Sequence, residues 1–519
     1  MDRKAGILFP VFSLASKYGI GCFSKEAYEF VDFLSRSGQG YWQILPIGPT
    51  GFGDSPYQPL SAFAGNPYFI SLEGLEKDGF LDKETLDSIQ WGSNLEKVDY
   101  GVMFENRFKV LEKAYDAFQK AVQQEEKKEK TAEKTDAKEQ KASEISELCK
   151  EFEEFKKRES YWLKDYALFM AIKEDQNGAS WLTWEKDLKK REKKALEEIQ
   201  KKLHHRVDFY SFLQFYFDKQ YRALREYAKE KNVRIIGDLP FYVSLDSADA
   251  WSHPEVFQMD KDLTPVAVAG CPPDAFSEDG QLWGNPLYDW EALKKGGFSW
   301  WVERFRRNYE LFDVIRIDHF HGFSDYYAIP YGEKTARKGK LKEGPGIAFF
   351  KEMEKRLGKL EIIAEDLGNN TPENEALLKE TGFPGMKVLQ YGFTSWDSYY
   401  VNHKHVKNCV VYTGTHDNTP SMAWIQEIND GQRAFARDYI NSKNTDYGAF
   451  VWDFIREAYR SVADLCMIPL QDYLCKGKEA RLNTPGTQGE NWQWRLTPKF
   501  LSRELEESIR RLAEIYGRI

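Results

Sequence analysis

The sequence predicts an α/β fold, a single (β/α)8 barrel of the TIM type with helical insertions over residues 1–519. Short apolar runs that are typical of buried strands recur along the chain. They lie at 7–9, 41–46, 233–240, 313–317, 361–368, 386–391 and 410–418. Several end in acidic residues and lead into long loops rich in Gly and Pro. Repetition of strand, decorated loop and helix indicates the barrel, although 519 residues also suffice for three smaller domains.

The run DVIRIDH at 313–319 shows the pattern best. Its apolar residues predict a buried strand that ends in charge. Arg316 precedes Asp318 by two positions, so both side chains point to the same face of a strand. A guanidinium in that position would keep Asp318 ionised, as a nucleophilic carboxylate requires. An ordinary buried Arg–Asp ion pair would give the same sequence pattern.

Three carboxylates, Asp318, Glu365 and Asp417, each end a different candidate strand. In a parallel barrel they would project into one mouth. Glycoside cleavage needs such a set, namely a nucleophile, a proton donor and negative charge near an oxocarbenium-like transition state. We expect Arg316 and His319 to hold Asp318 ionised. We expect the neighbouring acids to raise the pKa of Glu365, which suits a proton donor.

Histidines near these acids allow a second interpretation. His319 and His321, with His416 and Asp417, could form the metal site of a barrel hydrolase. Barrel hydrolases with a His-x-His pair usually carry it on the first strand, whereas this pair lies past the middle of the chain. We therefore expect no metal. His416, beside Asp417, could instead hydrogen-bond sugar hydroxyls.

Composition narrows the class of protein. The net charge of −9 argues against a non-specific nucleic-acid partner. An aromatic content of 15% suits a sugar-binding cleft lined with rings. The six cysteines show no C-x-x-C pair, and neither a signal peptide nor an apolar run of membrane length is visible. We expect a cytoplasmic enzyme with no membrane partner.

Two long segments differ from the barrel pattern. Residues 102–230 are nearly free of Pro and Gly and predict a mainly helical inserted subdomain, within which 119–143 form a polar Lys/Glu-rich arm. A solvated arm is favoured over a partner-binding coiled coil because the apolar seam is short. The loop 267–286 contains too much Gly and Pro for regular structure and predicts a lid. The segment 449–475 predicts helix.

Specific motifs follow one another in a recognisable order. They are SPYQ at 55–58, IGDLP at 236–240, PPDAFS at 272–277 with GQLWGNP at 280–286, RIDH at 316–319, AEDLG at 364–368, THDN at 415–418 and RLNTPG at 481–486. With these motifs the chain resembles, over nearly its whole length, the 4-alpha-glucanotransferases (amylomaltases or disproportionating enzymes) of glycoside hydrolase family 77, in the alpha-amylase clan.

The resemblance implies roles for individual residues. It makes Asp318 the nucleophile, Glu365 the acid/base and Asp417 the transition-state stabiliser. The residues that it implies in substrate binding are Ser55, Tyr57, Asp238, Asp274, Gln281, Trp283, Arg316, His319, His416 and Asn483, with Asp274 and Gln281 on the acceptor side.

The resemblance also implies a retaining, cofactor-free transfer between malto-oligosaccharides or alpha-glucans and the 4-hydroxyl of glucose or maltodextrin acceptors. We expect no separate C-terminal β-domain, and a monomer or homodimer.

Two features depart from the family pattern. Thr394 stands where many bacterial members carry a sugar-contacting aspartate, for which Asp397 is a candidate substitute, and the polar insertion after Phe118 is longer than in compact members. Two other functions remain open: an alpha-glucan hydrolase, and a non-catalytic glucan-binding protein with the same aromatic cleft.

Overall fold

The computed structural model describes residues 2–131, 136–273, 278–368, 371–487 and 489–519. Within these residues eight parallel strands close into a barrel, in the same order around the barrel as along the chain. They are β1 (Lys4–Leu8), β2 (Tyr41–Gln43), β3 (Arg234–Leu239), β6 (Val314–Ile317), β9 (Ile362–Ala364), β10 (Gly385–Val388), β11 (Cys409–Tyr412) and β12 (Leu465–Pro469). The last strand pairs with the first. The predicted (β/α)8 barrel is confirmed.

Apolar side chains from all eight strands fill the barrel interior, as in a packed core rather than a pore. They are Leu8, Tyr41, Ile236, Val314, Ile363, Met386, Val388, Val410, Tyr412, Leu465 and Met467. Ile236 pairs with Val314 and Asp238 with Arg316 in the register of β3 and β6. Because side chains alternate along a strand, Asp238 and Arg316 lie on the same inward face, one step nearer the carboxyl ends.

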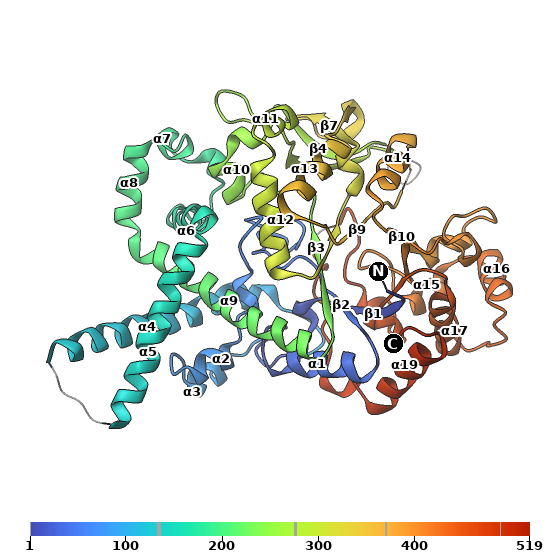
Figure 1. Ribbon diagram of the computed structural model, residues 1–519, viewed down its shortest axis with the longest axis horizontal. Helices are drawn as coiled ribbons and strands as arrows, with labels where there is room; N and C mark the ends of the chain where they lie inside the picture. The colour runs from blue at the N-terminus through green and yellow to red at the C-terminus, as the bar shows by residue number, and fades with distance from the viewer. Residues whose placement is uncertain (1, 132–135, 274–277, 369–370, 488) are drawn as a thin grey trace.

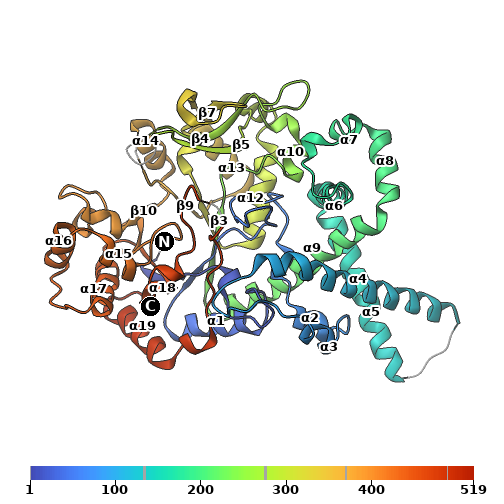
Figure 2. The same cartoon turned by 180° about the vertical axis from the view of Figure 1, so that it is seen from behind.

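Helices surround the barrel (Figures 1 and 2). Outside the insertion described below, they include α1 (Lys25–Arg36), α12 (Ser299–Leu311), α13 (Ile347–Leu357), α14 (Pro372–Thr381), α15 (Ser421–Glu427), α16 (Asp430–Ile440), α17 (Tyr447–Arg460), α18 (Leu470–Tyr473) and α19 (Arg503–Ile515). The prediction of helix over 449–475 is partly wrong, because β12 lies between α17 and α18. After β12 the described residues form no separate β-domain.

The main helical insertion lies between β2 and β3. It contains α4 (Tyr100–Thr131), α5 (Asp136–Arg158), α6 (Ser160–Asp175), α7 (Lys186–Lys189), α8 (Lys193–Lys202) and α9 (His204–Glu230), preceded by the short α2 (Leu72–Lys77) and α3 (Lys83–Asp87). The far ends of α4 and α5 project away from the barrel in both views (Figures 1 and 2). Among the described residues no helix has the length and apolar composition needed to cross a membrane.

The seam of the returning helix α5 packs as its spacing predicts. Phe152 lies 5.3 Å from Phe215 of α9, and Phe155 lies 5.8 Å from the same ring. Residues 132–135, and the side chains of 126–143, lie outside the described part of the chain. The extents of the subdomain (102–230) and of the polar arm (119–143) stay predictions.

A small antiparallel sheet takes two of its four strands from the segment 267–286, which we predicted to lack regular structure. Its order is β5-β4-β7-β8, formed by β5 (Gln281–Pro286), β4 (Ala267–Cys271), β7 (Asp325–Pro330) and β8 (Lys340–Glu343). Gly270 lies so close to β5 that a Cβ atom there would come within 2.2 Å of the Gln281 carbonyl oxygen. Glycine in this segment therefore permits close strand pairing. The prediction of an irregular loop over 267–286 is wrong for β4 and β5.

Candidate active site

Arg316 links two carboxylates at the mouth of the barrel. Its Nη1 donates to the two carboxylate oxygens of Asp238 at 2.7 and 2.8 Å and to Asp318 Oδ1 at 2.9 Å. Burial alone would lower the pKa of Arg316, but the two carboxylates raise it well above its ordinary value. The predicted same-face pair of Arg316 and Asp318 is confirmed. The Asp318 side chain keeps 30% exposure, which leaves it accessible from the mouth.

Glu365 follows β9 and is held by main-chain donors. Its Oε2 accepts from the His319 N–H and its Oε1 from the Leu367 N–H, both at 2.8 Å. Burial raises the pKa of Glu365, and the charge of Asp318 adds to the rise while Arg316 opposes it. The predicted rise in the pKa of Glu365 is confirmed, although burial contributes more to it than the neighbouring acid does. A carboxyl group with a raised pKa can act as a proton donor.

His319 occupies a turn with left-handed backbone, at a φ of 52°. Burial lowers the pKa of its imidazole to about 4, so the ring is neutral at neutral pH. Of the two residues predicted to hold Asp318 ionised, Arg316 is therefore the one that carries a positive charge. The ring packs edge-on against Trp283, 5.1 Å away, and 6.0 Å from Tyr242. Trp283 belongs to β5, so the small sheet reaches over the carboxyl end of the barrel.

Asp417 is held as an anion. Its Oδ1 accepts from Asn483 Nδ2 at 2.7 Å and lies 3.3 Å from His416 Nε2. Burial alone would raise the pKa of Asp417, but His416 and Asn483 together lower it to about 2. Arg481 donates to the main-chain oxygen of Asp417 at 2.9 Å and fixes the loop. An ionised carboxylate in this place can stabilise positive charge that develops on a sugar ring.

Tyr57 lies between Asp238 and His416. Its hydroxyl donates to Asp238 Oδ2 at 2.8 Å and lies 3.4 Å from His416 Nδ1. Its ring stacks on the His416 imidazole with centroids 5.0 Å apart. Trp492 packs 5.7 Å from Tyr57 and extends this aromatic surface. Such rings offer the apolar faces on which sugars stack.

Ser55 and Gln281, two further predicted residues, contact aromatic residues of the site. Ser55 Oγ accepts from the Tyr57 N–H at 3.3 Å and shapes the turn that presents Tyr57. Gln281 Oε1 accepts from Trp283 Nε1 at 3.1 Å. Asp274 lies outside the described residues. Asp397, the candidate substitute for an aspartate at 394, is exposed and accepts a hydrogen bond from Ser395.

The structure adds three residues that were not predicted in the site: Arg481, Trp492 and Tyr242. Arg481 stands in the RLNTPG motif and Trp492 in an aromatic loop, so both carried a sequence signal. Tyr242 follows β3 and gave no signal beyond its aromatic ring. Their positions depend on contacts between distant loops.

The histidines do not form the alternative metal site. The rings of His319 and His321 lie 6.5 Å apart, and His416 is engaged with Asp417 and Tyr57. In the described part of the chain, no group of three or more His, Cys, Asp or Glu is arranged to hold a metal ion.

Comparison with known proteins agrees with this arrangement. A family model described as 4-alpha-glucanotransferase matches residues 9–501. The chain belongs to the 4-alpha-glucanotransferase family. A family member from Clostridium butyricum is 44% identical over 98% of this chain and 99% of its own length. A Thermus thermophilus 4-alpha-glucanotransferase is 40% identical over the full length of both chains.

Solved structures of the family agree. The amylomaltase from Streptococcus agalactiae, in complex with acarbose, superposes with a TM-score of 0.91 at 39% identity and covers 99% of both chains. The amylomaltase from Corynebacterium glutamicum, at 19% identity and a TM-score of 0.74, shares the fold over 100% of this chain and 75% of its own. The protein is a 4-alpha-glucanotransferase, an amylomaltase-type enzyme that acts on alpha-glucans.

Proposed function

We propose that this 4-alpha-glucanotransferase retains the configuration of the bond that it transfers, through a covalent intermediate on Asp318. The supporting observation is the placement of Asp318, Glu365 and Asp417 after three strands of one closed parallel barrel. Asp318 attacks the anomeric carbon of an alpha-1,4 bond, while Glu365 gives its proton to the leaving oxygen. For this mechanism we expect the two carboxyl groups to lie about 5–5.5 Å apart.

In the second half-reaction the roles reverse. The Glu365 carboxylate takes the proton from the 4-hydroxyl of an acceptor sugar, whose oxygen attacks the anomeric carbon and releases Asp318. The anionic Asp417 stabilises the oxocarbenium-like character of both transition states. Arg316 donates a hydrogen bond to Asp318 and so supports this carboxylate as the leaving group.

The proposed substrates are malto-oligosaccharides and alpha-glucans, with glucose or maltodextrins as acceptors. The acarbose in the Streptococcus agalactiae structure supports this substrate class. The proposed sugar contacts are Ser55, Tyr57, Asp238, Asp274, Gln281, Trp283, Arg316, His319, His416 and Asn483. We also propose a cytoplasmic enzyme, as a monomer or homodimer, with no nucleic-acid partner.

Transfer rather than hydrolysis requires that water be kept from the intermediate. We assign this role to the small sheet that carries Trp283 over the barrel mouth. Incubation of the protein with maltotriose alone, with products separated by chain length, tests the proposal. Glucose plus a ladder of longer maltodextrins is expected; glucose and maltose without a ladder would show a hydrolase.

A further inference from the structure

His321 lies on a well-packed turn at the barrel mouth. It belongs to η5 (Phe320–Phe323), a short helical turn that follows β6. Phe323 of this turn is buried, and its ring lies 4.6 Å from Phe349 and 4.8 Å from Phe241. Close packing of this kind leaves a turn little freedom to shift. The imidazole of His321 is therefore carried by a fixed element.

The imidazole of His321 donates a hydrogen bond to the loop that carries Glu365. Its Nε2 lies 3.2 Å from the main-chain oxygen of Leu367. A carbonyl oxygen only accepts, so Nε2 carries the hydrogen and His321 is the donor. The other ring nitrogen, Nδ1, is buried and has no partner among the described residues. Within the described part of the chain, the hydrogen bonding of this ring is thus directed entirely at Leu367.

Leu367 is in turn one of the residues that hold Glu365. Its N–H donates to Glu365 Oε1, and the His319 N–H donates to Oε2, both at 2.8 Å. Among the residues that the structure describes, His321 is the only donor to the Leu367 carbonyl. A continuous chain of contacts therefore runs from the imidazole, through Leu367, to one oxygen of Glu365.

The contacts of Leu367 and His321 affect the charge state of Glu365 in the same direction. The Leu367 N–H stabilises the carboxylate, and so does the positive charge that His321 carries whenever it is protonated. Both lower the pKa of Glu365, against the larger effect of burial. Asp325 on β7 is close enough to interact with His321. Other charged or titratable groups near Glu365 are Arg316, Asp318, His319, Tyr391 and Tyr400.

We propose that His321 is a positioning residue for proton transfer, which holds Leu367 by its carbonyl so that the Leu367 N–H stays on Glu365 Oε1. This role of His321 rests on the acid/base role proposed above for Glu365. His321 acts through Leu367 and not by contact with the sugar. With the hydrogen bond intact, the Glu365 carboxyl group is held in one orientation, in which it presents its proton to the leaving oxygen.

Two substitutions separate the hydrogen bond of His321 from its charge. His321→Gln keeps an N–H donor near the position of Nε2 but carries no charge at any pH. His321→Phe keeps a ring and removes the donor. Thermal denaturation of each full-length variant verifies that it folds.

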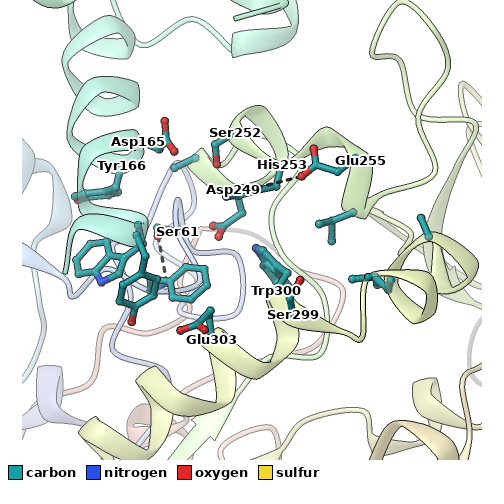
Figure 3. Close-up of a pocket in the computed structure, with 18 residues that line it drawn as sticks. Ser61, Asp165, Tyr166, Asp249, Ser252, His253, Glu255, Ser299, Trp300 and Glu303 are labelled. Carbon is teal, nitrogen blue, oxygen red and sulfur yellow. Dashed lines mark hydrogen bonds and ion pairs between the residues drawn. The ribbon is translucent and has the colours of Figure 1, made fainter. Parts of the chain in front are cut away.

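His253 provides a matched control in another part of the fold. Its Nδ1 lies 3.2 Å from Glu255 Oε1, the same length as the contact of His321 with Leu367, and both imidazoles are half-buried. His253 lines a cavity of about 430 Å³ between the helical insertion and the barrel helices (Figure 3). None of the residues placed in the active site lines this cavity. His253→Phe should therefore leave transfer unchanged.

Single-turnover rates with maltotriose and with alpha-glucosyl fluoride are measured across pH. In His321→Phe we expect the rate with maltotriose to drop about tenfold, and the fall in rate at high pH to move to higher pH. The rate with the fluoride should be unchanged, because its leaving group needs no proton. His321→Gln should restore both the rate with maltotriose and the wild-type pH profile.

Three results would overturn the proposal. The first is a His321→Phe protein whose rates and pH profile match those of the wild type. The second is an equal loss with both donors, which indicates a general disturbance of the mouth. The third is a His321→Gln protein that behaves as His321→Phe does, because charge and not positioning would then explain the effect. Failure of the acid role of Glu365 is distinguishable, since it would appear in Glu365→Gln protein with His321 intact.

Discussion

Arg316 Nη1 lies 2.7 and 2.8 Å from the two carboxylate oxygens of Asp238, and both residues are nearly inaccessible to solvent. The same nitrogen reaches Asp318. Asp238 therefore competes with Asp318 for one guanidinium. This competition sets how much positive charge the proposed nucleophile experiences, so Asp238 acts on Asp318 through Arg316.

Removal of the Asp238 carboxylate tests this relationship by stability. Asp238→Ala leaves a buried guanidinium without its main partner, which we expect to lower the free energy of unfolding by about 3–5 kcal/mol. Urea denaturation measures the change. Asp87→Ala is the control, because it breaks an exposed ion pair with Lys17 of the same 2.7 Å length and should cause no comparable loss. Equal losses in the two variants would contradict the importance of the buried pair.

Replacement of Glu365 by glutamine tests its role as the acid. Glu365→Gln is expected to lower kcat on maltotriose by roughly 10²–10⁴-fold, because the leaving sugar oxygen then receives no proton. A glucosyl fluoride donor needs no protonation of its leaving group, so the first step with it should be largely retained. Equal losses with both donors would place Glu365 outside the acid role. Glu361→Gln, near the start of β9, provides a control.

The raised pKa of Glu365 predicts the basic side of the pH profile. The first half-reaction needs protonated Glu365, so its rate falls as pH rises through the pKa of this group. Because burial raises that pKa, the fall should lie above 4.5, the ordinary value for a glutamate. Single-turnover rates across pH measure it. In Glu365→Gln the fall in rate at high pH should vanish. A fall that persists in this variant would show that another group causes it.

Removal of the Tyr57 hydroxyl tests the contact that links Asp238 to His416. Tyr57→Phe removes the 2.8 Å hydrogen bond to Asp238 and is expected to lower kcat/KM about tenfold. Tyr227→Phe removes a hydroxyl that donates to Asp32 at the same distance on the outer helix α9, and should leave kcat/KM unchanged. A similar effect of both variants would show a general loss of stability instead.

Local sequence pattern predicted much of the barrel. Runs that pass from apolar residues into acid, such as those before Asp318 and Glu365, combine a buried strand with a polar end and have few other interpretations. The run Leu465–Pro469 lacked such an ending, and periodicity alone does not separate a short buried strand from a helix. Strands β4 and β5 were missed because we interpreted glycine in this segment as a sign of irregular structure. In the fold, Gly270 instead allows the two strands to approach closely.

The partners within the site were harder to predict. Asp238 and Arg316 lie 78 positions apart, and only the register of β3 and β6 brings them together. The neutral state of His319 arises from burial under Trp283 and Tyr242, which distant segments supply. The residue types needed for this chemistry were therefore predictable from the sequence, while their charge states depend on the assembled mouth of the barrel.

Trapping of the sugar on the enzyme tests the central claim most directly. Glu365→Gln protein is incubated with a 5-fluoro-glucosyl fluoride donor, which forms the intermediate but releases it slowly, and its peptides are examined by mass spectrometry. A retaining mechanism predicts one added sugar on the peptide that contains Asp318, and no adduct in Asp318→Asn. An adduct on Asp417, or no adduct while transfer proceeds, would contradict a covalent intermediate on Asp318.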